Sequence, residues 1–393
     1  MRVQQILAQT EDFAPNNTAF TTLAQTTDAV EYLYETSAPG ASLDQPISGK
    51  LGICGNAWRK EQVSHVSNAE FSWMYNYFHW LTNDDHIEFA NEQGIEFVPM
   101  LDQNKVKLRG WDKCWLTGYD KYGNEKEKCD KDRIQEELAE TISQLTTPTR
   151  YLIGLNEPFD KNDDLPDKWV VAEDAAKLWG EYWMPIAKEL GLKLVSSTTI
   201  QVNDKADWMG DFFKHCWELR DAEVPCDVET VEVLNIHHYS CYYDDYINKY
   251  SNTSTDEDSF YWYLINHLTD PEWEGHDQFD WETFILSRPI WITETSCNAD
   301  YWPRQTVYQH QQCERMTGIE GGDWGEGSFQ AFKDIDNIHR VAPFVFYGSE
   351  TWEHVMLVNN EGELLPTGRA ILSDLDPEAA DCYAEPQYNL VWD

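Results

Sequence analysis

Two glutamates, Glu157 and Glu294, each stand at the end of an apolar stretch. The stretch 151–155 reads as a short buried strand that runs into Asn156-Glu157-Pro158, where the proline cannot continue a strand ladder. The stretch 289–293 leads to Glu294 in a similar way. When two carboxyl groups face one cleft, one can protonate the leaving oxygen of a glycosidic bond while the other attacks the sugar or activates water. The pattern therefore predicts acid–base chemistry on a sugar.

The elements that must position these glutamates alternate between strand-like and helix-like segments. Eight apolar segments read as strands, and enough residues for a crossover helix separate each from the next: 50–56, 71–78, 95–102, 151–155, 193–200, 231–239, 289–296 and 342–349. The alternation predicts a parallel sheet, and the number of strands predicts a single (β/α)8 TIM barrel. Barrel enzymes place their chemistry at the carboxyl ends of the strands, so Glu157 and Glu294 are expected to share one face.

The expected domain organisation is an N-terminal extension over 1–48, the barrel over 49–375 and a C-terminal tail over 376–393. A doubly wound open sheet is the alternative fold, but no Gly-x-Gly-x-x-Gly opens a helix after the first strand. Helices are expected over 84–93 and over 328–340, the second leading into the last strand. The segment 103–131 is expected to be a long loop.

The composition restricts the partners. The chain of 393 residues carries 29 basic and 70 acidic side chains, a formal net charge of −41. This charge repels phosphate backbones and anionic lipids, which argues against nucleic-acid and membrane partners and favours an uncharged substrate. Aromatic residues make up 14% of the chain and include 18 Trp, whose flat faces suit sugar rings. We therefore expect a polysaccharide or oligosaccharide substrate, no cofactor and a monomeric protein.

The nine cysteines are odd in number, so one thiol at least stays free. Three pairs that are close in sequence are compatible with disulfides and an oxidising compartment: Cys114 with Cys129, Cys216 with Cys226, and Cys297 with Cys313. No leader-like apolar run opens the chain, and no stretch reaches the roughly 18 apolar residues of a membrane span. An extracellular location after removal of a leader is expected, with an intracellular location as the alternative.

A metal site is weighed at His237 and His238 with Asp244 and Asp245. Adjacent residues of a strand point to opposite faces, so the two imidazoles cannot easily share one ion. No metal is expected.

Six short motifs spread over 50–375 carry a family resemblance: Asn156-Glu157-Pro158, Trp291-Ile-Thr-Glu294, Trp73-Met-Tyr-Asn-Tyr77, Phe97-Val-Pro-Met100, His237-His-Tyr239 and Leu364-Leu-Pro-Thr-Gly-Arg-Ala370. Together they resemble the signatures of clan A glycoside hydrolases, and most closely those of glycoside hydrolase family 128, a group of endo-β-1,3-glucanases. The resemblance implies a retaining hydrolysis of β-1,3-glucan within the chain.

The same resemblance implies roles for single residues. Glu157 would be the acid/base and Glu294 the nucleophile, while Asn156 would bond the sugar 2-hydroxyl and Tyr239 would orient the nucleophile. Burial and an ionised Glu294 would raise the pKa of Glu157, so that it keeps its proton near neutrality. Further substrate contacts are expected from four side chains: Tyr75, Asn76, His237 and Trp352. For Tyr75, Asn76 and Trp352 core packing is the alternative.

Two other functions stay open at the level of the sequence. One is a clan A hydrolase of different specificity, acting on mannan or β-1,6-glucan or as an exo-acting glucosidase. The other is a glycan-binding barrel without turnover, which the presence of both glutamates disfavours.

Overall fold

The computed structural model describes residues within the unit Leu43–Asp393: 49–55, 71–79, 81, 84–101, 117–119, 125–127, 131–158, 170–200, 202–239, 250–253, 259–296, 313, 332, 335–344, 357–359 and 363–372. The proposed limits of the N-terminal extension and of the tail fall on other residues and stay predictions. The expected α/β class with a parallel sheet is confirmed.

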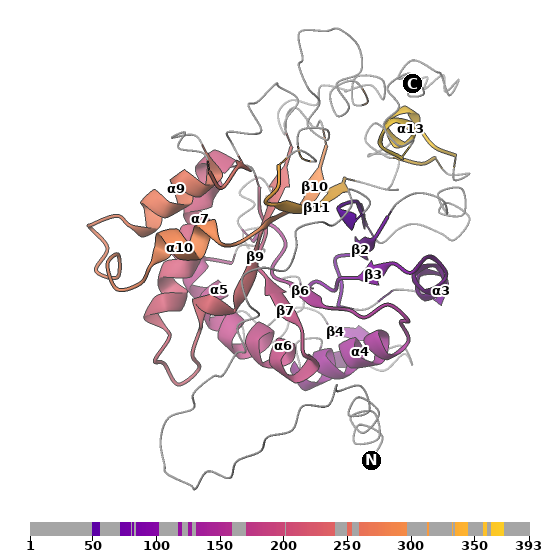
Figure 1. Cartoon of the computed structure of the whole chain (residues 1–393). Helices are drawn as coiled ribbons and strands as arrows, with labels where there is room; N and C mark the ends of the chain where they lie inside the picture. The colour runs from indigo at the N-terminus through magenta and orange to yellow at the C-terminus, as the bar shows by residue number, and fades with distance from the viewer. Residues whose placement is uncertain are drawn as a thin grey trace, which may run out of the picture. The chain divides into compact units, whose positions relative to one another are not determined.

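Parallel strands lie within seven of the eight expected segments, and the last strand is shifted: it covers Ile338–Pro343 and shares only residues 342 and 343 with the expected 342–349. The strands are β1 (Gly52–Cys54), β2 (Trp73–Tyr75), β3 (Glu96–Phe97), β6 (Tyr151–Ile153), β7 (Lys193–Val195) with the short β8 (Thr199–Ile200), β9 (Val231–His238), β10 (Ile290–Thr295) and β11 (Ile338–Pro343). One sheet has the order β1-β2-β3, and a second has the order β11-β10-β9-β7-β6 with β8 paired to β9 (Figure 1). Two isolated parallel bridges, Leu51 with Val341 and Met100 with Ile153, connect the ends of these sheets.

Helices follow most of the described strands along the chain (Figure 1). They are α3 (Asp84–Gln93), α4 (Lys131–Ser143), α5 (Ala172–Leu178), α6 (Met184–Leu190), α7 (Val202–Glu218), α9 (Phe260–Leu268), α10 (Trp281–Leu286) and α13 (Pro366–Leu372). The expected helix over 84–93 is confirmed, and Gly94, at φ +66°, ends it in the left-handed conformation that favours glycine. A π-helical turn, η5 (Trp179–Trp183), joins α5 to α6, and its Trp183 indole donates to the Ile153 carbonyl at the end of β6.

Two expectations are wrong in detail. The helix expected over 328–340 cannot extend to residue 340, because β11 already begins at Ile338. The segment pairs in parallel with β10, Ile338 with Ile290 and Arg340 with Trp291, and local sequence does not reveal this long-range pairing. The loop expected over 103–131 contains an antiparallel pair, β4 (Thr117–Tyr119) and β5 (Glu125–Glu127).

Successive side chains of the strands enter two different buried layers, as the two-residue period of a strand requires. One layer, here called the strand cluster, comes only from strands and the residues that directly follow them: Cys54, Trp73, Tyr75, Val98, Met100, Ile153, Val195, Val233, Trp291 and Ala342. Their strand neighbours, such as Ile53, Met74 and Leu152, belong to a larger cluster that includes the apolar faces of the helices. The strand cluster supports the side chains considered below.

A group of charges, here called the amino-end anchor, consists of Glu96, Arg150 and Arg340 at the amino ends of the strands. Arg340 donates to Glu96 Oε2 at 2.5 Å, and Arg150 donates to the same oxygen at 2.7 Å. The Arg340 guanidinium carbon lies 4.3 to 5.3 Å from three ring centres, those of Trp291, Tyr151 and Trp73. A buried arginine is tolerated here because a carboxylate and aromatic faces replace water around it.

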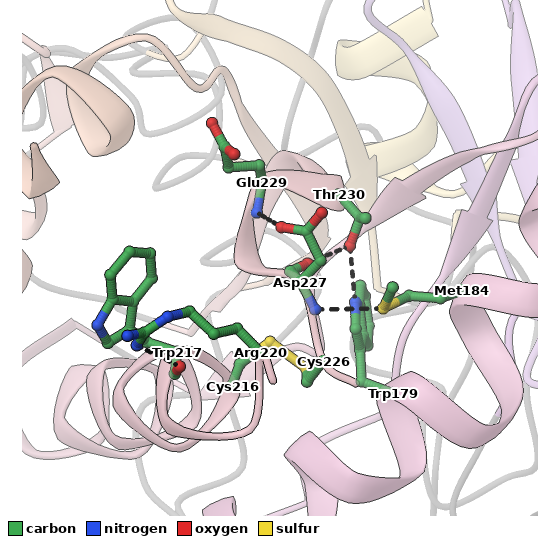
Figure 2. The surroundings of a disulfide bond; sticks show 9 residues. All are labelled: Trp179, Met184, Cys216, Trp217, Arg220, Cys226, Asp227, Glu229 and Thr230. Carbon is green, nitrogen blue, oxygen red and sulfur yellow. Dashed lines mark hydrogen bonds between the residues drawn. A yellow bond between two sulfur atoms is a disulfide. The ribbon is translucent and has the colours of Figure 1, made fainter. Parts of the chain in front are cut away.

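The expected disulfide between Cys216 and Cys226 is confirmed (Figure 2). It joins the last turn of α7 to the segment before η6 (Val228–Thr230), which leads directly into β9. The Thr230 hydroxyl donates to the Asp227 carbonyl and accepts from the Trp179 indole. Cys313 is also disulfide-bonded, to a cysteine outside the described residues, and the expected pair Cys114 with Cys129 lies outside them as well.

Among the described residues, no helix is both long enough and apolar enough to cross a lipid bilayer.

Candidate active site

The end of β6 presents Glu157. Gly154 permits a close approach to the neighbouring chain, because a Cβ there would lie 2.6 Å from the backbone nitrogen of Ser197. The Ser197 hydroxyl accepts from the Leu155 amide at 3.1 Å. Two residues later Glu157 has a φ of +42°, the one positive φ of a non-glycine residue in the described part of the chain. Unfavourable backbone conformations of this kind persist at functional sites because the surrounding structure imposes them.

The backbone of Glu157 makes a prediction about stability. We expect Glu157→Gly to be more stable than Glu157→Ala by about 1 kcal/mol, because glycine adopts a positive φ without the cost that a Cβ imposes. Both variants lack the carboxyl group, so their difference isolates the backbone. Urea unfolding of the two variants measures it, and an alanine variant as stable as the glycine variant would contradict the strain.

A bulge in β10 presents Glu294. Ile292 pairs with Ile236 of β9, but the next pairs are Glu294 with His237 and Thr295 with His238, so Thr293 is an extra residue on β10. Strict alternation after Trp291, which belongs to the strand cluster, would turn Glu294 away from that cluster. The extra residue restores the inward direction, a known use of bulges beside active sites.

Three tyrosine hydroxyls donate hydrogen bonds to the Glu294 carboxylate. Tyr77 donates to Oε1 at 2.7 Å, Tyr75 lies 3.2 Å from the same oxygen, and Tyr239 donates to Oε2. Burial raises the pKa of each of these hydroxyls well above its usual value, so all three keep the protons that they donate. Glu294 is therefore held on both oxygens.

Burial raises the pKa of the Glu294 carboxyl, and the nearby Glu157 adds to this shift. His237 and hydrogen bonds from Tyr239 and Tyr77 oppose the shift. The balance leaves Glu294 a stronger base than an exposed glutamate, while the hydroxyl donors favour its ionised form.

The buried imidazole of His237 lies between the two glutamates. Its Nδ1 is 2.5 Å from Glu157 Oε1, and its Nε2 is 3.4 Å from Glu294 Oε1. Burial lowers the pKa of His237 to about 4, although Glu294 opposes the shift. The imidazole is therefore neutral at neutral pH and lies between the two carboxyl groups. It is hydrogen-bonded to Glu157 through Nδ1, while Nε2 has no hydrogen-bond partner among the described residues.

Glu157, His237 and Glu294 also form the one group of metal-ligating side chains found among the described residues, with one ligand atom of each within 4.8 Å of the others. However, Nδ1 of His237 faces Glu157 and Nε2 faces Glu294. A single ion bound to both carboxylates could therefore be coordinated by the imidazole only after the ring had rearranged. The arrangement fits a hydrogen bond between His237 and Glu157 better, and we assign no metal to it.

The structure brings five of the expected site residues together with Glu157: Tyr75, Asn156, His237, Tyr239 and Glu294. Asn156 is half-buried, and its Oδ1 is without a hydrogen-bond partner among the described residues. Tyr75 is 1% exposed, so it lies behind Glu294 rather than on a surface open to substrate. Asn76 is 2% exposed, and its side chain accepts from the Phe78 amide. Trp352 lies outside the described residues.

Sequence reasoning missed two members of the site, Tyr77 and Cys54. Tyr77 stands two residues after Tyr75, and the period of a strand could have placed both hydroxyls on one side. Cys54 ends β1 and pairs in register with Tyr75. No local signal in the sequence distinguishes Cys54 from a cysteine that serves packing alone.

Two neighbouring glutamates at the carboxyl ends of parallel strands, with a neutral histidine between them, define the class of the protein as glycoside hydrolase. The family model for the glycosyl hydrolase catalytic core matches residues 52–262, more than half of the 393 residues. The chain belongs to this family. Glu157 and His237 fall within the matched residues, and Glu294 follows them.

Solved structures show the same fold. An endo-β-1,3-glucanase of glycoside hydrolase family 128, subgroup II, from Sorangium cellulosum is 21% identical, with a TM-score of 0.50, over 82% of this chain and 98% of that one. A second enzyme of that subgroup, from Pseudomonas viridiflava, is 17% identical, with a TM-score of 0.51, over 82% of this chain and 97% of that one. No curated protein sequence matches the chain.

Proposed function

We propose that the protein is a retaining, endo-acting β-1,3-glucanase of glycoside hydrolase family 128. The observation that carries the proposal is the pair Glu157 and Glu294, whose nearest oxygens lie within 4.8 Å of each other across His237. Retaining enzymes hold their carboxyl groups about 5 to 5.5 Å apart, whereas inverting enzymes leave room for a water between groups about 6.5 to 9.5 Å apart. The close approach favours the retaining mechanism.

In this mechanism Glu157 protonates the glycosidic oxygen while Glu294 attacks the anomeric carbon and forms a glycosyl ester. Glu157 then takes a proton from water, which attacks the same carbon, breaks the ester and leaves a sugar of unchanged anomeric configuration. The tyrosine hydroxyls on Glu294 hold it in the direction of attack. With the single proton of neutral His237 on Nδ1, the ring donates to Oε1 of Glu157 and leaves the other oxygen to carry the catalytic proton.

Asn156 is proposed to bind the sugar 2-hydroxyl, because its half-buried side chain precedes Glu157 and offers an acceptor atom without a described partner. Tyr239, Tyr75 and His237 act on the glutamates rather than on the sugar. The substrate contact expected of Trp352 stays a prediction.

We also infer that the strands close into a (β/α)8 barrel. Support comes from the two isolated parallel bridges: one joins the residue before β1 to β11, and the other joins the residues after β3 to β6. The Val341 amide also donates to the Lys50 carbonyl at 2.8 Å. With these links, the strands run in chain order from β1 through β6 to β11 and back to β1.

A panel of glucans tests the proposed activity. Laminarin-like β-1,3-glucan, mixed-linkage glucan, β-1,6-glucan, mannan and xylan are incubated with the enzyme, and product lengths are followed over time. Oligosaccharides of several lengths from the β-1,3-glucan, first released as the β anomer, are expected. Release of monosaccharide alone from long chains would show that the enzyme is exo-acting. If the product is first released as the α anomer, a retaining mechanism is excluded.

The pH dependence of the reaction is a further prediction. The raised pKa of Glu294 means that its carboxyl takes up a proton at a higher pH than an exposed glutamate, and the protonated form cannot attack. The acid limb of kcat/KM should therefore lie above the ordinary glutamate value of about 4.3. His237, with a pKa of about 4, cannot produce such a limb. A profile that stays flat down to the ordinary range would contradict the burial effect.

A further inference from the structure

Cys54 lies beneath the nucleophile and contacts the tyrosines that hold it. It is fully buried at the end of β1, and among the described cysteines it is the one without a disulfide. Its Sγ donates to Tyr75 Oη at 3.0 Å and lies 3.5 Å from Tyr77 Oη. These are the two hydroxyls that approach Glu294 Oε1.

The number of protons in this group decides the role of the thiol. Each hydroxyl has one proton. Tyr77 directs its proton to Glu294, and Tyr75 directs its proton to the Thr293 carbonyl at 2.9 Å and to Glu294. Neither tyrosine therefore has a proton left for the sulfur, so the thiol must be the donor. Its hydrogen bond occupies a lone pair of Tyr75 Oη and turns the hydroxyl proton away from the sulfur, toward the bulge that carries Glu294.

We propose that Cys54 is a positioning residue for the nucleophile, acting through Tyr75 and Tyr77. The inference rests on the proposed role of Glu294. Burial raises the pKa of the Cys54 thiol well above its usual value, which keeps the proton that the sulfur donates. The same burial makes the thiol a poor nucleophile, because thiolates and not thiols attack.

The ionisable groups that face Glu294 come from four places in the fold. They are Cys54 from β1, Tyr75 and Tyr77 from β2 and the residues after it, Glu157 from the end of β6, and His237 and Tyr239 from β9 and the residue after it. In a chain of hydrogen bonds each donor strengthens the next. Loss of the thiol should therefore weaken the Tyr75 bond to Glu294 and raise the pKa of the carboxyl further.

The experiment compares Cys54→Ala and Cys54→Ser with Val98→Ala, a change in the same strand cluster without a polar atom. For Cys54→Ala we expect kcat on β-1,3-glucan to fall roughly 3- to 10-fold, the effect of one neutral hydrogen bond. KM should change less than about twofold, because the sugar does not touch the sulfur. The acid limb should move to higher pH in Cys54→Ala, return most of the way in Cys54→Ser, and stay in place in Val98→Ala.

Thermal unfolding of the three variants separates positioning from a general loss of stability. If Cys54→Ala retains the wild-type acid limb, or if Val98→Ala moves the limb equally, the inference is overturned while the proposed function stands. Should the wild type cleave none of the glucans, the proposed function fails. In that case the pKa of the Glu294 carboxyl is measured directly in the wild type and in Cys54→Ala. The measurement is an NMR titration of protein with ¹³C-labelled glutamate, and Glu294→Gln assigns the resonance. An unchanged carboxyl pKa in Cys54→Ala overturns the inference there too.

Discussion

Glu294→Gln is expected to lower kcat on β-1,3-glucan by roughly 10⁴-fold or more, because an amide cannot form the glycosyl ester that splits the reaction into two steps. The substitution also places an NH₂ group against a tyrosine hydroxyl that donates to the native carboxylate. Binding of glucan should survive, since the side chain keeps its shape. Steady-state kinetics and titration calorimetry with an oligosaccharide measure the two effects.

A matched control for this variant is Glu232→Gln. Glu232 also belongs to a strand, β9, but it is partly exposed and lies 4.0 Å from Lys193. We expect Glu232→Gln to keep wild-type kinetics. Substantial turnover in Glu294→Gln, with Glu232→Gln unaffected, would remove Glu294 from the role of nucleophile.

Glu157→Ala is expected to lower kcat on natural glucan by roughly 10²- to 10⁴-fold, the usual contribution of a general acid and base. An aryl glycoside with a good leaving group needs no proton for the first step, so its glycosyl ester should still form and accumulate. Azide, which needs no general base, should then attack the ester and restore turnover, with a β-glycosyl azide as the product. Mass spectrometry and NMR of the product follow this rescue.

The configuration of the azide product discriminates the roles of the two glutamates. An α-glycosyl azide from Glu157→Ala would exchange the roles of Glu157 and Glu294. Wild-type rates without azide would show that the proton comes from another group. The bridge from His237 to Glu157 is lost in this variant, so the pH profile of the rescued reaction should also be recorded.

The parts of the fold that could be predicted from sequence are those that local chemistry determines. Pro158 ends the apolar run of β6 and so places Glu157 at its carboxyl end. The apolar period and Gly94 set the limits of α3. The opposite directions expected for His237 and His238 are observed as well, because one contacts Glu157 and the other Tyr250.

The parts that could not be predicted depend on contacts between distant residues. The bulge at Thr293 exists through the register of β10 against β9, and strict alternation would have turned Glu294 the wrong way. The start of β11 depends on its pairing with β10, where Ile338 lies opposite Ile290 and Arg340 opposite Trp291. Tyr75 and Asn76 lie in positions that suit aromatic and amide contacts with sugar, yet both are buried once the neighbouring strands are in place.

The amino-end anchor lies at the opposite ends of the strands from the two glutamates. Glu96, Arg150 and Arg340 connect the strands without using any residue of the candidate active site. Replacement of the segments that follow the carboxyl ends of the strands should therefore alter which glycan is cleaved without destabilising the sheet. Such a division makes the scaffold suitable for grafting new specificity.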